Sequence, residues 1–264
     1  MTGKTHRQGG MLCALVGFLF LKWNNYLLSN VSSILQLLII YPFAMWGSVA
    51  SDLDHHWDSC PDKNVPNYII NRLLHITTPI FKKLNDSLSE RQKKDSFEYK
   101  VAKLFSANHR SWQTHSDLTL IIAVFCLLSS LKGKIIVYEL NDVEVAIMSL
   151  ALSGVVLGII AHFILDMLTP SGVWFTIGIL INKILKHKIL PEKLRFVPKS
   201  KRFATGGEWE NFIRGIVRKA TIVATVILIT DFICPEVTKY ALDWVLVQLQ
   251  FIYHWFTSFK ISIS

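Results

Sequence analysis

The sequence predicts an all-α fold, a polytopic membrane helical bundle with about five to six spans and a cytoplasmic helical insertion. Of the 264 residues, 51% are apolar, and the mean hydropathy of +0.37 is too high for an ordinary soluble domain. Charged residues still make up 18% of the chain, so sizeable polar loops must accompany the spans. The clearest apolar segments are residues 9–28, 31–50, 118–131, 143–168 and 219–234.

The first expected span, residues 9–28, follows a basic start that carries Lys4, His6 and Arg7. A basic start before an apolar stretch is also typical of a signal peptide. No small-residue cleavage site precedes Trp23, and a second apolar run follows at once. We therefore expect the N-terminus to be retained, and His6 with it.

The second span, residues 31–50, contains Pro42 as a tolerated kink. The polar, Lys-rich region after it forms the predicted insertion, residues 56–107, and is expected to be helical in pieces such as 68–84 and 92–105. The third span is short, but it extends backwards through Thr114 and so places His115 in its first turn.

The expected domain organisation is a membrane-embedded domain, residues 1–234, followed by a C-terminal segment, residues 235–264. Residues 173–185 are apolar and suit an interfacial helix. The C-terminal segment mixes aromatic residues with Asp243 and His254, so it suits either an interfacial helix or a sixth span.

The fourth apolar segment, residues 143–168, ends with a possible metal-binding pair. His162 and Asp166 are four residues apart on a helix that Pro170 and Gly172 end, so they share one face. They could bind one metal ion, or be a core histidine and the carboxylate that orients it. A carboxylate in a membrane-spanning segment is costly unless it is paired or functional, which favours a site.

Other ligand-type residues are expected on the same side of the membrane. By the predicted topology, one side receives 23 of the 28 Lys and Arg residues, so that side is the cytoplasm by the positive-inside rule. The same side receives the candidate ligands and site residues: His6, Asp52, Asp54, His55, His109, Arg110, His115, His162, Asp166, Glu208 and Glu210.

Histidine and carboxylate ligands suit Zn, Mn or Fe, and a cluster this rich could bind one, two or more ions. The cysteines are scattered without a C-x-x-C pair, which argues against a thiolate site. Neighbouring ions favour phosphoester hydrolysis. Arg110 could pair with a phosphate, and Glu210 or Glu208 could be a late ligand or the general base.

These motifs together resemble the YdjM-like family of inner-membrane-associated, metal-dependent hydrolases, which is also described as LexA-regulated. The resemblance covers most of the chain up to about Arg218, although members usually carry Pro where this chain has Ser51. It implies a metal-dependent hydrolase in the bacterial inner membrane. Its motifs are His6, Asp52-Leu53-Asp54-His55, His109-Arg110 with Thr114-His115-Ser116, His162 to Gly172, and Thr205-Gly206 with Glu210.

The order of these residues is more distantly similar to zinc-dependent phospholipase C and single-strand nucleases. That similarity implies His162 and Asp166 on zinc, with Asp52 or Asp54 bridging ions or activating water.

The prediction is therefore a membrane-bound phosphoesterase whose partners are membrane lipids and whose substrate is a phospholipid or related amphiphile. A nuclease or nucleotide hydrolase remains open because the net charge is +9, although nucleic acid is the minority interpretation. A non-enzymatic protein, for metal or ion transport or stress response with a structural metal site, also remains open.

Overall fold

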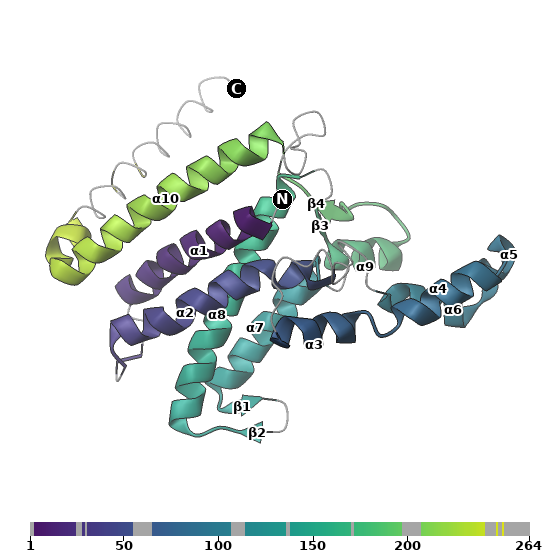
Figure 1. The fold of residues 1–264 in the computed structure, drawn as a ribbon, viewed down its shortest axis with the longest axis horizontal. Coiled ribbons are helices and arrows are strands. Elements are labelled where there is room, and N and C mark those ends of the chain that lie inside the picture. The colour runs from purple at the N-terminus through teal and green to yellow at the C-terminus, as the bar shows by residue number, and fades with distance from the viewer. Residues whose placement is uncertain are drawn as a thin grey trace. The chain divides into compact units, whose positions relative to one another are not determined.

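The computed structural model describes residues 3–24, 28–29, 31–54, 65–106, 114–135, 138–169, 172–196, 207–240, 247 and 250. These residues are mostly helical, as predicted (Figure 1). The chain divides into two compact units, Met1–Arg218 and Lys219–Ser264, and the division lies within helix α10 (Glu208–Ile233). The expected domain boundary after residue 234 stays a prediction.

Four helices of the first unit form its core. Helix α2 (Ser33–Ala50) packs along α8 (Asp142–Met167), α1 (Gly3–Trp23) packs against both, and α7 (Asp117–Leu131) packs against α8 (Figure 1). Most of the buried apolar side chains lie on α1, α2 and α8. On the α7 side, partly buried Leu120 and Ala123 pack against a buried cluster of Ile159, Phe163 and Val173.

Local sequence signals define the starts of the two most apolar helices. Asn141 and Glu144 form a capping box at the start of α8, each side chain accepting a hydrogen bond from the other residue's backbone N–H. Ser32 caps α2 through the backbone N–H of Leu35. Both helices therefore begin where the sequence predicted an apolar segment to begin.

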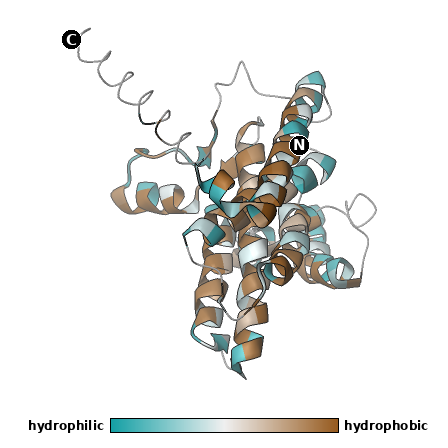
Figure 2. Cartoon of the chain, turned by 90° about the vertical axis from the view of Figure 1, so that its left-hand side faces the viewer, coloured by the Kyte–Doolittle hydropathy of each residue, from teal (hydrophilic) through white to brown (hydrophobic). Residues whose placement is uncertain are grey.

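Among the described residues, two helical segments are long and apolar enough to cross a membrane, Ser33–Asp54 and Asp142–Met167. Hydrophobic colour covers most of the long helices (Figure 2). Helix α7 is apolar, but its 15 residues extend only about 22 Å, less than the ~30 Å hydrocarbon core. The other predicted spans, and the total of five to six, stay predictions.

Small residues allow α2 and α8 to approach closely. A Cβ atom added at Gly158 would collide with the carbonyl oxygen of Ala44 and lie 2.6 Å from the backbone nitrogen of Ser48. A Cβ at Gly154, one turn earlier, would collide with the carbonyl oxygen of Ile40. This G-x-x-x-G spacing is typical of membrane helices whose backbones are in contact.

The polar insertion is helical, as expected, but in shorter pieces. It forms α3 (Val65–Leu74), α4 (Thr78–Ser87), α5 (Glu90–Asp95) and α6 (Phe97–Phe105). Pro79 lies in the first turn of α4, where a proline is tolerated because its missing N–H would have no acceptor within the helix.

The all-α prediction missed two small antiparallel sheets that occur in the described part of the chain. Strands β1 (Lys134–Ile135) and β2 (Tyr138–Glu139) join α7 to α8, and β3 (Val173–Trp174) pairs with β4 (Lys193–Leu194). Helix α9 (Thr176–Leu185) follows β3 and precedes β4 in the chain. Asp117 accepts hydrogen bonds from the first two backbone N–H groups of α9.

The glycine contact gives the first prediction. Substituting Gly158→Ala should destabilise the protein by about 1–3 kcal/mol, because the added methyl group meets backbone atoms that cannot move independently. The expected result is a lower melting temperature of the detergent-purified protein. Gly215→Ala is the control, since a Cβ there meets no atom within 4 Å among the described residues. Equal melting temperatures for the two variants would contradict close packing of α2 on α8.

Candidate metal centre

His162 and Asp166 lie on the last two turns of α8, and both are fully buried. The Nδ1–H of His162 donates to the backbone carbonyl oxygen of Ser48 at 2.7 Å. This hydrogen bond fixes the tautomer, so Nε2 carries the lone pair. That Nε2 lies 3.5 Å from Oδ2 of Asp166 and makes no hydrogen bond within the described residues. It is therefore available as a ligand atom.

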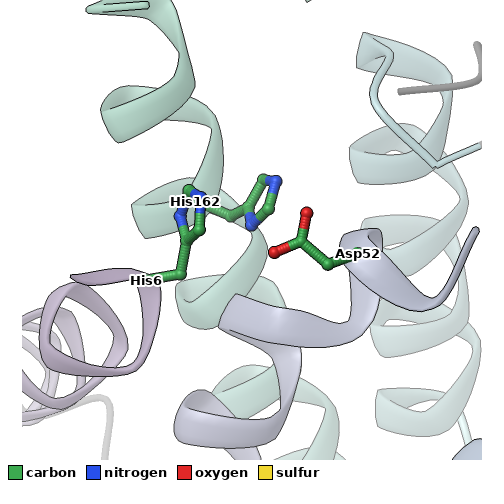
Figure 3. A group of neighbouring side chains, drawn as sticks. All are labelled: His6, Asp52 and His162. Atoms are coloured by element: carbon green, nitrogen blue, oxygen red, sulfur yellow. The ribbon is translucent and has the colours of Figure 1, made fainter. Parts of the chain in front are cut away.

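His6 and Asp52 approach His162 from two other helices. The His6 ring, in the first turn of α1, stacks on the His162 ring with centroids 3.9 Å apart, and its Nε2 lies 3.5 Å from Oδ1 of Asp166. Asp52 comes from η1 (Ser51–Asp54), the 3₁₀ turn that follows α2. The three side chains of His6, Asp52 and His162 point toward one another (Figure 3).

His115 completes the cluster from the residues just before α7. Its Nε2 lies 3.5 Å from Oδ1 of Asp52 and 3.6 Å from Oδ2 of Asp166. Its backbone carbonyl accepts a hydrogen bond from the N–H of Trp174 in β3. Burial alone would lower the pKa of His115, but the neighbouring carboxylates of Asp52 and Asp54 raise it to about 9. The carboxylates around this ring thus create a potential that favours a cation.

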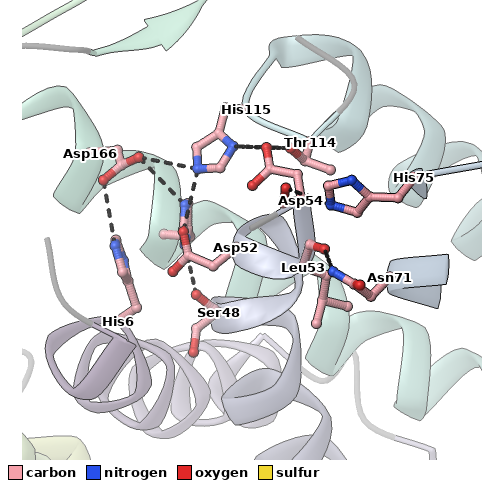
Figure 4. Close-up of polar contacts among 11 residues, drawn as sticks. His6, Ser48, Asp52, Leu53, Asp54, Asn71, His75, Thr114, His115 and Asp166 are labelled. Carbon is pink, nitrogen blue, oxygen red and sulfur yellow. Dashed lines mark hydrogen bonds and ion pairs between the residues drawn. The ribbon is translucent and has the colours of Figure 1, made fainter. Parts of the chain in front are cut away.

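Asp54 lies on the other side of the His115 ring. Thr114 donates its hydroxyl to Oδ2 of Asp54 at 2.6 Å, and its oxygen lies 3.0 Å from Nδ1 of His115 (Figure 4). Nδ1 of His115 is also 3.3 Å from Oδ2 of Asp54. A carboxylate on the far nitrogen of an imidazole typically orients a metal-binding histidine. The arrangement favours this role for Asp54, and its assignment as a direct ligand stays a prediction.

The spacing of the ligand atoms suits a metal ion. Two overlapping groups, His6/Asp52/His162 and His115/His162/Asp166, each have ligand atoms within 4.8 Å of one another and share His162. Atoms bound to one tetrahedral zinc at 2.0–2.1 Å are about 3.4 Å apart. The closest ligand atoms in the cluster are 3.5–3.6 Å apart. The residues therefore fit one shared ion or two neighbouring ions.

A polar network held by hydrogen bonds alone explains the cluster less well. N–H···O hydrogen bonds are usually 2.7–3.2 Å long, shorter than the imidazole–carboxylate distances in the cluster. Asp52 and Asp166 are also 6% and 0% exposed, and buried carboxylates need a compensating charge. A divalent cation would supply that charge.

Other predicted site residues are not part of these two groups. Glu210, at the start of α10, is buried and accepts a hydrogen bond from Thr5 at 2.7 Å, one residue before His6. Glu208 is exposed. The remaining candidates, His55, His109 and Arg110, lie outside the described residues.

Sequence reasoning missed the groups that orient the ligands. Ser48 contributes only its backbone carbonyl, so no side-chain pattern could reveal it. Asn71 and His75, from α3 and the turn after it, donate to the carbonyl oxygens of Leu53 and Asp54. Thr114 belongs to the Thr114-His115-Ser116 motif. Its position directly before His115 was the one sequence signal that could have indicated its role in orienting that ring.

The fold and the site together define a class: a helical protein that has two segments long and apolar enough to span a membrane and a buried histidine–carboxylate cluster at the ends of these segments. The model of the YdjM inner membrane protein family matches residues 1–179, and the chain belongs to that family. The match includes the five residues of the two candidate groups and ends before Glu210. The resemblance to this family is confirmed, whereas the more distant one to phospholipase C and nucleases is not.

No curated protein and no solved structure matches the chain significantly.

Metal binding by the cluster is tested by removing its shared ligand. His162→Ala should lose metal during purification, because both candidate groups use this imidazole. His187→Ala is the control, since His187 is exposed outside the cluster. Elemental mass spectrometry of detergent-purified protein gives the metal content. Wild-type protein that stays metal-free after zinc and manganese supplementation would rule out the site.

The role of Asp54 is tested by its amide variant. Asp54→Asn should weaken metal affinity by about 10–100-fold and keep the stoichiometry at saturation, because it alters only the group that orients His115. Asp166→Asn should lower the stoichiometry itself. Competition titration with a chelator measures both quantities. An equal loss of stoichiometry in both variants would make Asp54 a direct ligand.

Proposed function

We propose that this protein is a membrane-bound, metal-dependent hydrolase of phosphoester bonds in a phospholipid or related amphiphile. One observation carries the proposal: five buried ligand side chains from four segments converge at one end of the helical bundle. They come from the start of α1, the end of α2, the start of α7 and the end of α8. A structural metal would need no such concentration of imidazoles beside buried carboxylates.

The ligands of the proposed metal, Zn, Mn or Fe, are His6, Asp52, His115, His162 and Asp166. A metal bound here would polarise a phosphoryl oxygen and acidify a bound water, the chemistry that phosphoester hydrolysis requires. The chain's own contribution is to keep the imidazoles in the ligand tautomer. The Ser48 carbonyl does this for His162, and Thr114 with Asp54 does it for His115.

Three further residues are assigned to the reaction itself. Glu210 is proposed as the general base, because it is a buried carboxylate tied to the segment that carries His6. Arg110 is proposed to bind the phosphate through its guanidinium. Asp54 is proposed to assist the reaction by orienting His115. In the alternative role, Asp54 activates water directly.

The substrate class follows from where the site lies on the helices. The ligands are near the ends of two helical segments that are long and apolar enough to span a bilayer, so a site there would lie at headgroup level. The proposed orientation is cytoplasmic for both the N-terminus and the site, because 23 of 28 Lys and Arg residues lie on that side of a multi-pass topology with five to six spans.

Activity is tested on metal-loaded protein in lipid nanodiscs with phospholipid, nucleotide and single-stranded DNA substrates. Wild type should release phosphate or headgroup from a phospholipid, and His162→Ala should fall to background. Glu210→Gln should lower kcat by about 10²–10⁴-fold with unchanged metal content, because only the proton acceptor is lost.

The same substrate screen separates the alternatives. Turnover of DNA or nucleotide alone would replace the proposed substrate by a nucleic acid. Stoichiometric metal without turnover of any substrate would contradict the enzyme and favour a structural or transport site.

A further inference from the structure

Helix α3 has an unusual distribution of side chains. Its two buried residues are both polar, Asn67 at 0% and Asn71 at 2% exposure. Its apolar residues are turned outward: Val65 is 73% exposed, Ile69 53%, Leu73 62%, and Ile76, in the turn that follows, 67%. Their spacing of four, four and three residues places them on one face of the helix. The helix is thus amphipathic with its polar face inward.

The polar face of α3 is bound to the segment that carries the metal ligands. Asn67 accepts a hydrogen bond from the indole N–H of Trp46 in α2 at 2.7 Å. Asn71 donates to the carbonyl oxygen of Leu53, and Nε2 of His75 donates to that of Asp54 at 3.0 Å (Figure 4). The orientation of α3 is therefore fixed by hydrogen bonds, which leaves no freedom to turn the apolar face inward.

We propose that the apolar face of α3, formed by Val65, Ile69, Leu73 and Ile76, is a lipid-docking surface that lies among the acyl chains at the membrane interface. Such a face costs free energy in water, roughly in proportion to its apolar area, and a bilayer removes that cost. The proposal concerns membrane contact and does not rest on the proposed hydrolase activity.

Attachment to α2 favours lipid as the occupant. Trp46 joins α3 to α2, and the exposed Phe43 lies one turn away on the same face of α2, which belongs to a segment long and apolar enough to span a membrane. Indole side chains are typical of the membrane–water boundary. The hydrogen bond thus attaches α3 to a segment that is long and apolar enough to span a membrane, so lipid lies within reach of the exposed face.

Charge supports the same occupant. Arg72 flanks the apolar face, where its guanidinium packs over the Tyr68 ring at 5.2 Å and donates to the Tyr68 hydroxyl. Such a side chain reaches headgroups while its stem lies in the apolar layer. In the described insertion, residues 65–106, eight Lys and Arg residues accompany four Asp and Glu residues. This excess of positive charge complements anionic lipids.

Membrane contact at α3 also affects the position of the proposed metal ligands. Because Asn71 and His75 bind the backbone of η1, a membrane that fixes α3 also fixes the turn that carries Asp52 and Asp54. The insertion, bound to the membrane, then holds the η1 turn in position.

The proposal is tested by spin labels on single cysteines in an otherwise cysteine-free full-length protein, reconstituted in vesicles of zwitterionic and anionic phospholipid. Labels replace Ile69 and Leu73. Leu38, exposed on α2, is the lipid-facing control, and Lys94, exposed on α5, is the water-facing control. Collision with oxygen, which concentrates in lipid, is compared with collision with a water-soluble nickel chelate.

The labels at Ile69 and Leu73 should show a ratio of oxygen to nickel collision several-fold above that at Lys94 and similar to that at Leu38. A ratio equal to that at Lys94 would place the face in water and overturn the proposal. Low collision with both reagents would also overturn it, because it would mean that a protein surface covers the face.

Discussion

The burial of Asp52 and Asp166 among three imidazoles is the constraint on which the rest of the first unit depends. A carboxylate taken out of water loses its hydration, and only a nearby cation or several good hydrogen bonds can compensate that loss. The imidazole nitrogens face these carboxylates at distances longer than hydrogen bonds and close to those of ligands that share an ion. The burial of these carboxylates is therefore consistent with the metal binding that we propose.

The helices satisfy this constraint by meeting at their ends. Close contact between α2 and α8, possible because Gly154 and Gly158 lack side chains, brings the Ser48 carbonyl to His162. The packing that joins the two most apolar helices thus also selects the tautomer of a candidate metal ligand. The carbonyl of His115 is bound by β3, so the small sheet contributes to the site in the same way.

The hydrogen bonds that orient the site reach the predicted insertion. Asn71 and His75 connect its first helix and the turn after it to η1, and the opposite face of that helix is apolar and exposed. In a soluble protein this arrangement would be unfavourable, because polar side chains are buried while apolar ones meet water. In a member of an inner membrane protein family, the lipid contact that we propose for that face explains the arrangement.

The sequence by itself determined the helical class, the main apolar segments and the family, because hydropathy and the i, i+4 spacing of His162 and Asp166 are local properties of the chain. It also predicted that His6, Asp52, His115, His162 and Asp166 would lie on one side of the membrane, and the structure brings these five side chains into one cluster. Only the tertiary structure decided which side-chain atoms of these residues face one another. It also decided that Asp54 lies on the far nitrogen of His115 and that the polar face of α3 is turned inward. Those features depend on backbone carbonyls and on contacts between segments far apart in the chain, which leave no periodic signal in the sequence.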